Sequence, residues 1–401
     1  MDDIETILGQ PLSDNIFADL CRDDERLRQS LEKHMRNVFA PELRKEMRTF
    51  SPSEAASLIG VTVSNLRKLH HDGKIPDVEQ DKRGYRNYSG ADIDAIRIAL
   101  GRSARDPFQY LPGRRAGEHL QVLTFSTFKG GSAKTTSSIH TAQRLALKGY
   151  KVLAIDMDPQ GSLTTMMGLM TDLEMGEMPT IYDAIRYEDQ LSMKEVVRKS
   201  YFHNLDIAPA GLILSEFETE TPRHMNKLGI VPFYLRLRSA IDQVADDYDI
   251  VIIDCPPQLG YLTLSSLVAA TGLMITIIPN MLDVASLSQY LSMATSVLQV
   301  VANHGMQLEY DFQRYLLCRY EPSDSPQAQM SGFLRYVFGP RLMTEVFLKS
   351  TAVSDAGLRQ MTLYEISRAE VNKQTLDRAL DSINQVVDEL ERTIHKAWGR
   401  S

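Results

Sequence analysis

The sequence predicts an α/β fold, a parallel sheet flanked by helices, preceded by an N-terminal winged helix-turn-helix domain. Four short apolar runs alternate with helical stretches after residue 118, as strands and helices do in a parallel sheet. A glycine-rich loop lies between the first of these runs and a helix. Ahead of them, two helix-capping signals frame a compact stretch of short helices between residues 49 and 102.

Length and charge limit the functions that the chain can have. Its 401 residues are enough for two domains, and shares of 43% hydrophobic and 24% charged residues are typical of a globular protein. The acidic start, Met1 to Glu5, is followed by no apolar stretch, so we expect no secretory signal and a cytoplasmic protein. Because the formal net charge is -8, any DNA contact must come from local basic patches.

The cysteines offer no chemistry of their own. Cys21, Cys255 and Cys318 are widely separated and odd in number, which provides neither a disulfide framework nor the spacing of metal ligands. We therefore expect all three to be structural thiols.

The first 48 residues are expected to be helical. Apolar residues recur there at three- and four-residue spacing on one face, namely Leu27, Leu31, Met35, Val38 and Phe39. This pattern predicts a helix that packs or dimerises through that face.

Residues 49–102 have the order helix, turn, helix, wing, helix. Ser51 to Glu54 form a capping box with Pro52 at the first helical position, and this helix ends at Gly60. A second helix runs from about Val63 to Leu69 and a third, capped at Ser89, runs to Leu100. The stretch 103–117 is rich in Pro, Gly and Arg, so we expect an irregular linker there and the next domain from residue 118 to the end.

Four strands are expected in the larger domain. Each is apolar along its length, as buried parallel strands are, and they cover Val122–Thr127, Val152–Ile155, Ile250–Ile253 and Leu273–Ile278.

A phosphate-binding loop follows the first of these strands. The run from Phe128 to Thr136 reads FKGGSAKTT and directly precedes a helix that extends to about Lys148. Gly130 and Gly131 allow consecutive N–H groups to turn inward, and the helix N-terminus adds partial positive charge. Lys134 can then reach phosphate oxygens, Thr135 can bind Mg²⁺ and Thr136 can donate to another phosphate.

Acidic residues end two of the strands. Asp156 and Asp158 follow Val152–Ile155, and Asp254 ends the β-branched run Ile250–Ile253. Ligands bind at the carboxyl ends of parallel strands, and residues two apart on an extended segment point the same way. We therefore expect Asp156 and Asp158 to face the nucleotide and Asp254 to bind Mg²⁺.

These motifs resemble the deviant Walker A ATPases, a family that includes partition ATPases, cell-division positioning ATPases and nitrogenase iron proteins. The resemblance covers roughly residues 118–380, with the family's early lysine present as Lys129 and Ala133 standing where the general P-loop pattern has Gly. It implies a nucleotide-dependent homodimer in which Lys129 reaches the partner's phosphates. It also implies that Asp158 polarises the attacking water, that Asp156 helps to hold the magnesium shell, and that the loop residues Lys129, Gly130, Gly131, Ser132, Ala133, Lys134, Thr135 and Thr136 bind the phosphates.

A further segment of the family pattern lies near the adenine. Ile278, Pro279 and Asn280 at the end of the fourth strand resemble it, so Pro279 and Asn280 are added to the expected nucleotide site.

Residues 49–100 resemble the DNA-binding module of MerR-type regulators. The matching blocks are Thr49 to Ala56, Gly60 to Thr62, Asn65 to Leu69 and the wing from Arg83 to Tyr88. The second helix is expected in the major groove and the wing against the backbone. The DNA contacts expected from these elements are Ser64, Asn65, Arg67, Lys68, His70, Lys82, Arg83, Tyr85 and Arg86.

The two halves together look most like long plasmid-encoded partition ATPases, the RepA proteins of repABC-type replicons. That resemblance implies a Mg-dependent ATPase with weak basal activity that segregates plasmids, represses its own operon, and binds operator DNA and nonspecific nucleoid DNA. It also implies a ParB-type centromere-binding partner and a cytoplasmic, nucleoid-associated location.

Two alternatives stay open. A membrane-cycling ATPase of the MinD kind would need a basic amphipathic helix at the C-terminus; the last helix has an apolar stripe, but the acidic residues beside it favour core packing over contact with a membrane. A transcription regulator that only senses nucleotide would not need Asp158 and Lys129, whose presence favours hydrolysis.

Overall fold

The computed structural model describes residues 16–38, 45–80, 82, 84–127, 129–169, 178–225, 229, 231–367 and 371–400. The chain forms two compact units, which divide between Glu46 and Met47. In the first unit, helix α2 covers Ile16–Val38. Leu27, on the apolar face expected there, is 62% exposed. The side chains of Leu31, Met35 and Val38, and all of Phe39, lie outside the described residues.

The second unit begins with the three short helices that the sequence predicts. Helix α3 starts at Pro52 because the Ser51 hydroxyl accepts from the N–H of Glu54, while the Glu54 carboxylate accepts from the N–H of Ser51 at 2.9 Å. Ser89 and Asp92 repeat this capping box at the start of α5. The strand-like contacts of the wing are the isolated bridges Phe50 to Tyr88 and Gln80 to Arg86. The three helices are α3 (Pro52–Ile59), α4 (Val63–His71) and α5 (Gly90–Ser103).

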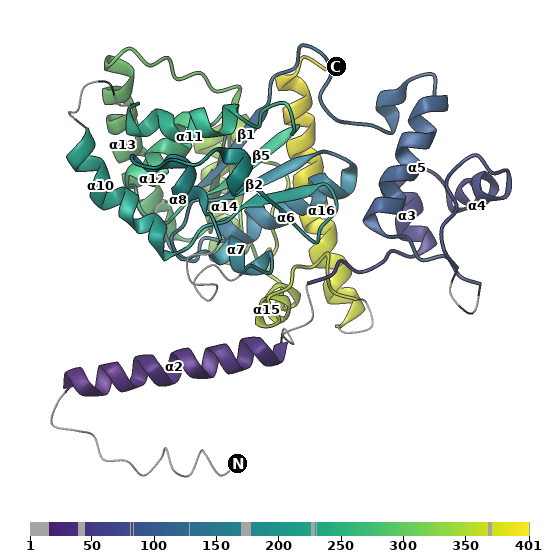
Figure 1. Cartoon of the computed structure of the whole chain (residues 1–401), viewed down its shortest axis with the longest axis horizontal. Coiled ribbons are helices and arrows are strands. Elements are labelled where there is room, and N and C mark those ends of the chain that lie inside the picture. Colours follow the sequence, from purple (N-terminus) through teal and green to yellow (C-terminus); the bar gives the residue numbers. More distant parts are fainter. Residues whose placement is uncertain are drawn as a thin grey trace, which may run out of the picture. The chain divides into compact units, whose positions relative to one another are not determined.

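A seven-stranded sheet forms the centre of the second unit, with strand order β3-β4-β2-β5-β1-β6-β7. All neighbouring pairs are parallel except β3 with β4, and Figure 1 shows helices on both sides of the sheet. The α/β class with an N-terminal helix-turn-helix is thus confirmed. The strands are β1 (Gln121–Ser126), β2 (Val152–Asp156), β3 (Arg198–Lys199), β4 (Leu205–Ala208), β5 (Ile250–Asp254), β6 (Gly272–Ile277) and β7 (Phe312–Leu317).

Side chains of one strand alternate between two hydrophobic layers, because successive residues of an extended chain point to opposite faces. In β2, Val152 and Ala154 join the layer that contains helices α6 and α16, whereas Leu153 and Ile155 join the layer that contains α11 and α12. The helices around the sheet are α6 (Lys134–Lys148), α7 (Ser162–Met166), α8 (Ile181–Ile185), α9 (Met193–Val196), α10 (Glu216–His224), α11 (Phe233–Asp242), α12 (Tyr261–Ala269), α13 (Met281–Asn303), α14 (Ser325–Phe338), α15 (Thr351–Leu358) and α16 (Lys373–Ala397), with short 3₁₀ turns at Pro107–Gln109, Leu212–Ser215 and Gly339–Arg341.

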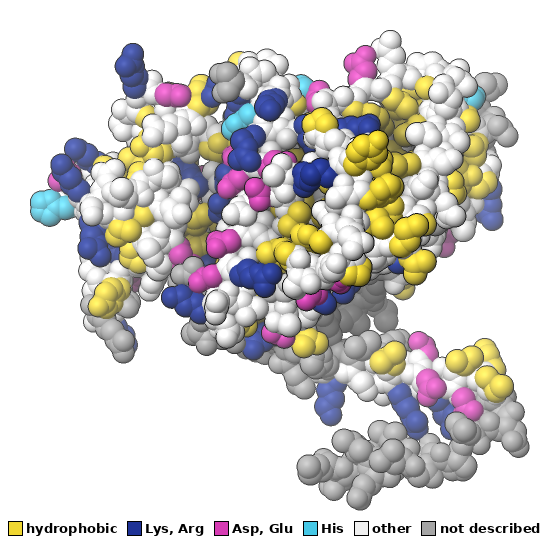
Figure 2. Space-filling model, turned by 180° about the vertical axis from the view of Figure 1, so that it is seen from behind, with side chains coloured by type: hydrophobic (Ala, Val, Ile, Leu, Met, Phe, Trp, Pro, Cys, Tyr) yellow, Lys and Arg dark blue, Asp and Glu magenta, His cyan; other side chains and the backbone are white. Residues whose placement is uncertain are grey.

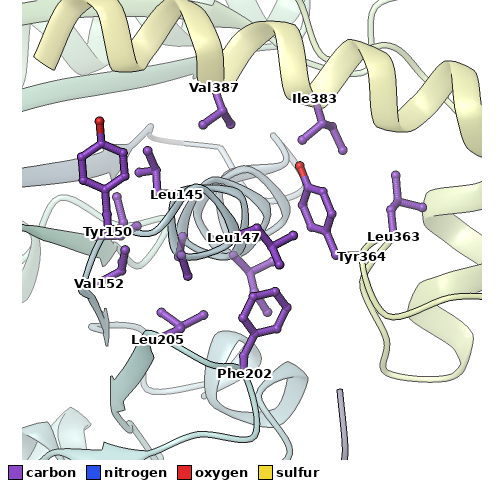
Figure 3. Close-up of a cluster of buried hydrophobic side chains, with 14 of the residues drawn as sticks. Leu145, Leu147, Tyr150, Val152, Phe202, Leu205, Leu363, Tyr364, Ile383 and Val387 are labelled. Carbon is purple, nitrogen blue, oxygen red and sulfur yellow. The ribbon is translucent and has the colours of Figure 1, made fainter. Parts of the chain in front are cut away.

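Helix α6 lies in the middle of the larger layer. Figure 3 shows Leu145 and Leu147 of α6 among Val387 and Ile383 of α16, Tyr364 from the segment before α16, and the aromatic ring of Phe202. The apolar stripe of α16 is buried, which confirms the prediction that the last helix packs in the core.

The predicted linker 103–117 is irregular apart from the 3₁₀ turn, but it is packed against the sheet domain. The main-chain N–H of Arg114 donates to Asp249 at 2.7 Å, and the guanidinium of Arg400 donates to the carbonyl oxygens of Pro112 and Gly113, both at 2.8 Å. The helix-turn-helix residues share one hydrophobic cluster with α6 and α16. The module therefore packs on the sheet domain.

Candidate nucleotide and DNA sites

The phosphate loop connects β1 to α6 and has the backbone of an anion cradle. Gly131 has φ 76° and Ala133, directly before α6, has φ 65°. A Cβ added at Gly130 or Gly131 would meet nothing within 4 Å, so the space above the loop is open. No side chain caps the N-terminus of α6, which leaves its first N–H groups available to phosphate oxygens. Phe128 lies outside the described residues.

Lys134 is buried at the start of α6. Its ammonium group donates to the carbonyl oxygen of Lys129 at 3.2 Å, and burial lowers its pKa although Asp254 nearby acts in the opposite direction. A buried ammonium with one weak partner is well placed to exchange that partner for a phosphate.

Asp254 lies below the loop at the end of β5. Its two carboxylate oxygens accept hydrogen bonds from Thr135 at 2.6 Å and from Ser138 at 2.8 Å. Asp156 is at the same register on the neighbouring strand. Burial raises the pKa of both carboxyls, and the charge of Asp254 adds to the effect on Asp156. Two buried acids beside a threonine hydroxyl are oxygen ligands that suit Mg²⁺, whose charge would stabilise their ionised forms.

Asp156 and Asp158 do not face the same way, contrary to the expectation that both would face the nucleotide. Both oxygens of Asp156 are directed into the protein, where one accepts from the Thr164 N–H and hydroxyl at 2.9 and 2.8 Å and the other from the Asp158 N–H. Strand β2 ends at Asp156 and a turn closed by the hydrogen bond from the Gly161 N–H to the Asp158 oxygen follows, so the alternation of an extended segment does not hold for Asp158. Asp158 is partly exposed and lines the cleft.

The cleft above the loop has a volume of about 840 Å³. The loop residues from Gly130 to Thr136 form one wall together with Asp158. The rest of the lining comes largely from segments after β7 that sequence reasoning missed, because no motif marks them; Arg319 among them donates to the carbonyl oxygen of Gly131 at 3.4 Å. The lining residues of these segments are Arg319, Glu321, Ser323, Phe347, Leu348, Lys349, Ser350, Thr351, Val353, Ser354, Arg378, Ala379 and Ile383.

The structure does not bring Pro279 and Asn280 to this cleft. The side-chain oxygen of Asn280 instead caps α13 by accepting from the N–H of Asp283 at 2.9 Å. Lys129 is also absent from the cleft lining, and its ammonium group lies 2.7 Å from a carboxylate oxygen of Asp283.

The expected DNA contacts of α4 are largely accessible. Ser64, Asn65, Arg67 and Lys68 are exposed, whereas Leu66 is buried in the core of the module. His70 differs from the expectation, because its ring nitrogen hydrogen-bonds the buried Tyr88 hydroxyl at 3.0 Å and so ties α4 to the wing. We therefore interpret His70 as a packing residue.

Among the wing cations that the structure describes, one is paired with an acidic residue and one is exposed. Arg86 is paired with Asp77 at 3.1 Å, Lys82 and Tyr85 are exposed, and Arg83 lies outside the described residues. On the face that Figure 2 shows, Lys and Arg side chains are scattered among acidic ones. DNA recognition by this module would thus depend on a few side chains of α4 and the wing.

In the described part of the chain, no helix is long and apolar enough to cross a membrane. Cys255 and Cys318 are buried, and burial raises the pKa of each thiol to about 12, as expected for structural thiols. Cys21 is exposed on α2, and its prediction as a structural thiol stays a prediction.

Comparison with known proteins supports both the ATPase domain and the DNA-binding module. A family model for an AAA domain matches residues 120–308, and one for MerR HTH family regulatory proteins matches residues 50–99. A protein named replication protein A from Rhizobium rhizogenes is 46% identical over 393 residues and covers 97% of each chain. The protein SopA of Escherichia coli strain K12 is 30% identical over 337 residues, which are 82% of this chain and 84% of SopA.

Solved structures support the fold. A structure titled as a partition protein superimposes with a TM-score of 0.67 at 17% identity, over 96% of this chain and 100% of that one. A complex of Cyanothece McdA with ATP gives a TM-score of 0.55 at 19% identity, over 71% of this chain and 98% of the other. With the sequence relatives, these findings show that the chain belongs to the ParA-type partition ATPases, in the RepA-like group with a MerR-type DNA-binding module.

Proposed function

We propose that this plasmid-partition ATPase hydrolyses ATP in the cleft above the phosphate loop and couples the nucleotide state to DNA binding. The observation that carries the proposal is the convergence of the open loop, the Thr135 to Asp254 hydrogen bond and the partly exposed Asp158 at one edge of the sheet. These are the groups that phosphoryl transfer needs, because its catalysis depends on positioning and on charge stabilisation.

Each group has a distinct role in this proposal. The N–H groups from Gly130 to Thr136 and the ammonium group of Lys134 bind the phosphates. Thr135 and Asp254, supported by Asp156, would hold Mg²⁺, and the bound ion would neutralise phosphate charge. Asp158 orients the attacking water, and Lys129 contributes from the other copy of a homodimer.

The nucleotide base has two candidate positions. Pro279 and Asn280 were expected beside it, but they lie away from the cleft wall. We place the base against Phe347 and Val353, which supply apolar surface to the lining of the same cavity.

The N-terminal module is proposed to read an operator through α4 and the wing and to repress the operon of the protein itself. A ParB-type protein is proposed as the partner that delivers the plasmid centromere, and nonspecific nucleoid DNA as the surface to which the ATP state binds. The proposed location is the cytoplasm, associated with the nucleoid.

The test is ATP hydrolysis by the purified chain with and without nonspecific DNA. We expect weak turnover that DNA stimulates, that Asp158→Ala abolishes, and that Asp242→Ala, an exposed aspartate on α11, leaves unchanged. A turnover rate that DNA does not change would contradict the proposed coupling of ATP hydrolysis to DNA binding. Tight ATP binding without turnover would instead favour a regulator that only senses nucleotide.

A further inference from the structure

Lys129 is held by its own chain in this structure. Its ammonium group forms an ion pair with Asp283 at 2.7 Å, although the residues that follow it in the loop line the nucleotide cleft. Asp283 lies in the first turn of α13, and its side chain is only 6% exposed. The pair therefore joins the phosphate loop to the start of α13, and Lys129 is not among the residues that line the cleft of its own chain.

Few groups other than Lys129 offset the negative charge of Asp283. A cavity of about 10 Å³ beside the pair is lined by Ser132 and Thr276, among others. The hydroxyls of Ser132 and Thr276, and both oxygens of Asp283, have no hydrogen-bond partner among the described residues, so the Lys129 contact is an ion pair without hydrogen-bond geometry. Apart from the Lys129 ion pair, the negative charge of Asp283 is thus offset mainly by the N-terminus of α13. Withdrawal of Lys129 would leave a buried carboxylate poorly compensated, which is unfavourable.

Two large apolar side chains lie next to the pair on the outside of the molecule. Met281 and Leu282 begin α13 directly before Asp283, and they are 68% and 75% exposed. Methionine is enriched in protein interfaces, and apolar side chains gathered at one exposed position favour contact with another protein. In the proposed function, the protein that Lys129 reaches is a second copy of this chain.

We propose that Asp283 is a positioning residue that holds Lys129 out of action in the single chain, and that a second copy releases the lysine when it covers Met281 and Leu282. This inference rests on the proposed role of Lys129 across the dimer. Asp283 then opposes dimerisation, because the dimer must break the ion pair before Lys129 can bind the partner's phosphates.

The experiment is a double-mutant cycle on full-length protein, with dimer dissociation constants measured by sedimentation in a nonhydrolysable ATP analogue and Mg²⁺. Asp283→Asn keeps the shape of the side chain and removes its charge, so we expect the dimer to tighten about tenfold, within the usual range of coupling between sites. In a Lys129→Gln background the same substitution should change nothing. Asp183→Asn, at the equivalent first-turn position of α8, is the matched control.

The cycle separates the possible results. Tightening that persists in the Lys129→Gln background would overturn the inference, because Asp283 would then act on the interface directly. No tightening in either background would also overturn it, and Asp283→Ser repeats the test if the asparagine variant does not fold. If Lys129→Gln alone leaves ATP-dependent dimerisation and hydrolysis intact, the proposed role of Lys129 fails instead.

A second measurement uses the nucleotide-free chain. The rate at which an amine-reactive ester acylates Lys129, followed by peptide mass spectrometry, should rise several-fold in Asp283→Asn while that of the exposed Lys151 stays constant. An unchanged rate at Lys129 would mean that the ion pair does not restrain it.

Discussion

The guanidinium of Arg97 on helix α5 donates a hydrogen bond to the main-chain oxygen of Leu147, near the end of helix α6, at 2.7 Å. It also donates to the oxygen of Leu58 at the end of α3, and it is only 3% exposed. Helix α6 begins at the phosphate loop and ends at this contact with the DNA-reading module. Helix α6 thus connects the phosphate loop to the DNA-binding module.

Replacement of Arg97 should weaken this connection. Arg97→Met leaves two buried carbonyl oxygens without a donor, so we expect the free energy of unfolding to fall by about 2 to 4 kcal/mol. Urea denaturation measures the loss, and the exposed Arg102→Met is the control. In the variant, operator affinity should also become less dependent on nucleotide while ATP hydrolysis continues. An affinity that keeps its full nucleotide dependence would show that coupling takes another route.

Ala133 has a left-handed backbone, and this conformation is strained for a residue with a Cβ. Ala133→Gly should remove about 1 to 2 kcal/mol of strain at a cost of about 0.4 to 1 kcal/mol in unfolded-chain entropy. The net expectation is a gain of roughly 0.5 to 1 kcal/mol in stability, seen as a higher urea midpoint. Gly131→Ala, at φ 76°, should change stability in the opposite direction. A destabilised Ala133→Gly protein would contradict the strain.

Because His140 is buried, we expect the free energy of unfolding to depend on pH. The imidazole is fully buried, with Nδ1 against the oxygen of Thr136 and Nε2 accepting from the N–H of Leu363, and burial lowers its pKa from 6.5 to about 4. The unfolded chain therefore binds a proton that the folded chain does not. The contribution of neutral His140 to the free energy of unfolding is complete above pH 6.5. It is lost as the pH falls towards about 4, by about 1.4 kcal/mol per pH unit.

Urea denaturation at a series of pH values checks this expectation. His140→Gln should be less stable than the wild type at neutral pH, because it cannot make both hydrogen bonds, but its stability should fall less steeply on acidification. Parallel curves for the two proteins would assign the pH dependence to other groups.

Thr135 tests the magnesium site. Thr135→Ala removes the hydroxyl that hydrogen-bonds Asp254, and we expect the Mg²⁺ concentration needed for half-maximal hydrolysis to rise about 10- to 100-fold. Thr135→Ser keeps the hydroxyl and should stay near the wild type. If both substitutions behave alike, the hydroxyl is not part of the metal site.

Residues of α4 are expected either to contact DNA or to pack within the module. Arg67→Ala should weaken operator binding by about 1 to 3 kcal/mol if it contacts a base, or reduce the salt dependence by about one unit if it contacts a phosphate. His70→Ala should lower the thermal stability of the module instead, because it loses the Tyr88 hydrogen bond. Binding titrations over a salt series, with thermal unfolding of each variant, distinguish the two effects.

The sequence by itself determined the features that have a strong local signal. The capping boxes at Ser51 and Ser89 place two helix starts, and each of the four apolar strands is present with its ends shifted by at most one residue. The loop, Thr135 and Asp254 meet as expected, because the carboxyl ends of parallel strands share one edge of the sheet. The short β4 and the edge strand β7 carry charged or polar residues such as Asp206 and Arg314, and this weakened their apolar pattern.

Only the tertiary structure decided which groups share a site when they are distant in the chain. Residues between Phe347 and Ser354 line the same cavity as a loop about 200 residues earlier in the chain. The Lys129 to Asp283 ion pair, the inward turn of Asp156 and the Arg97 contact with Leu147 also depend on how the layers pack. No local periodicity encodes these contacts, because burial in the folded core selects the partner of each polar group.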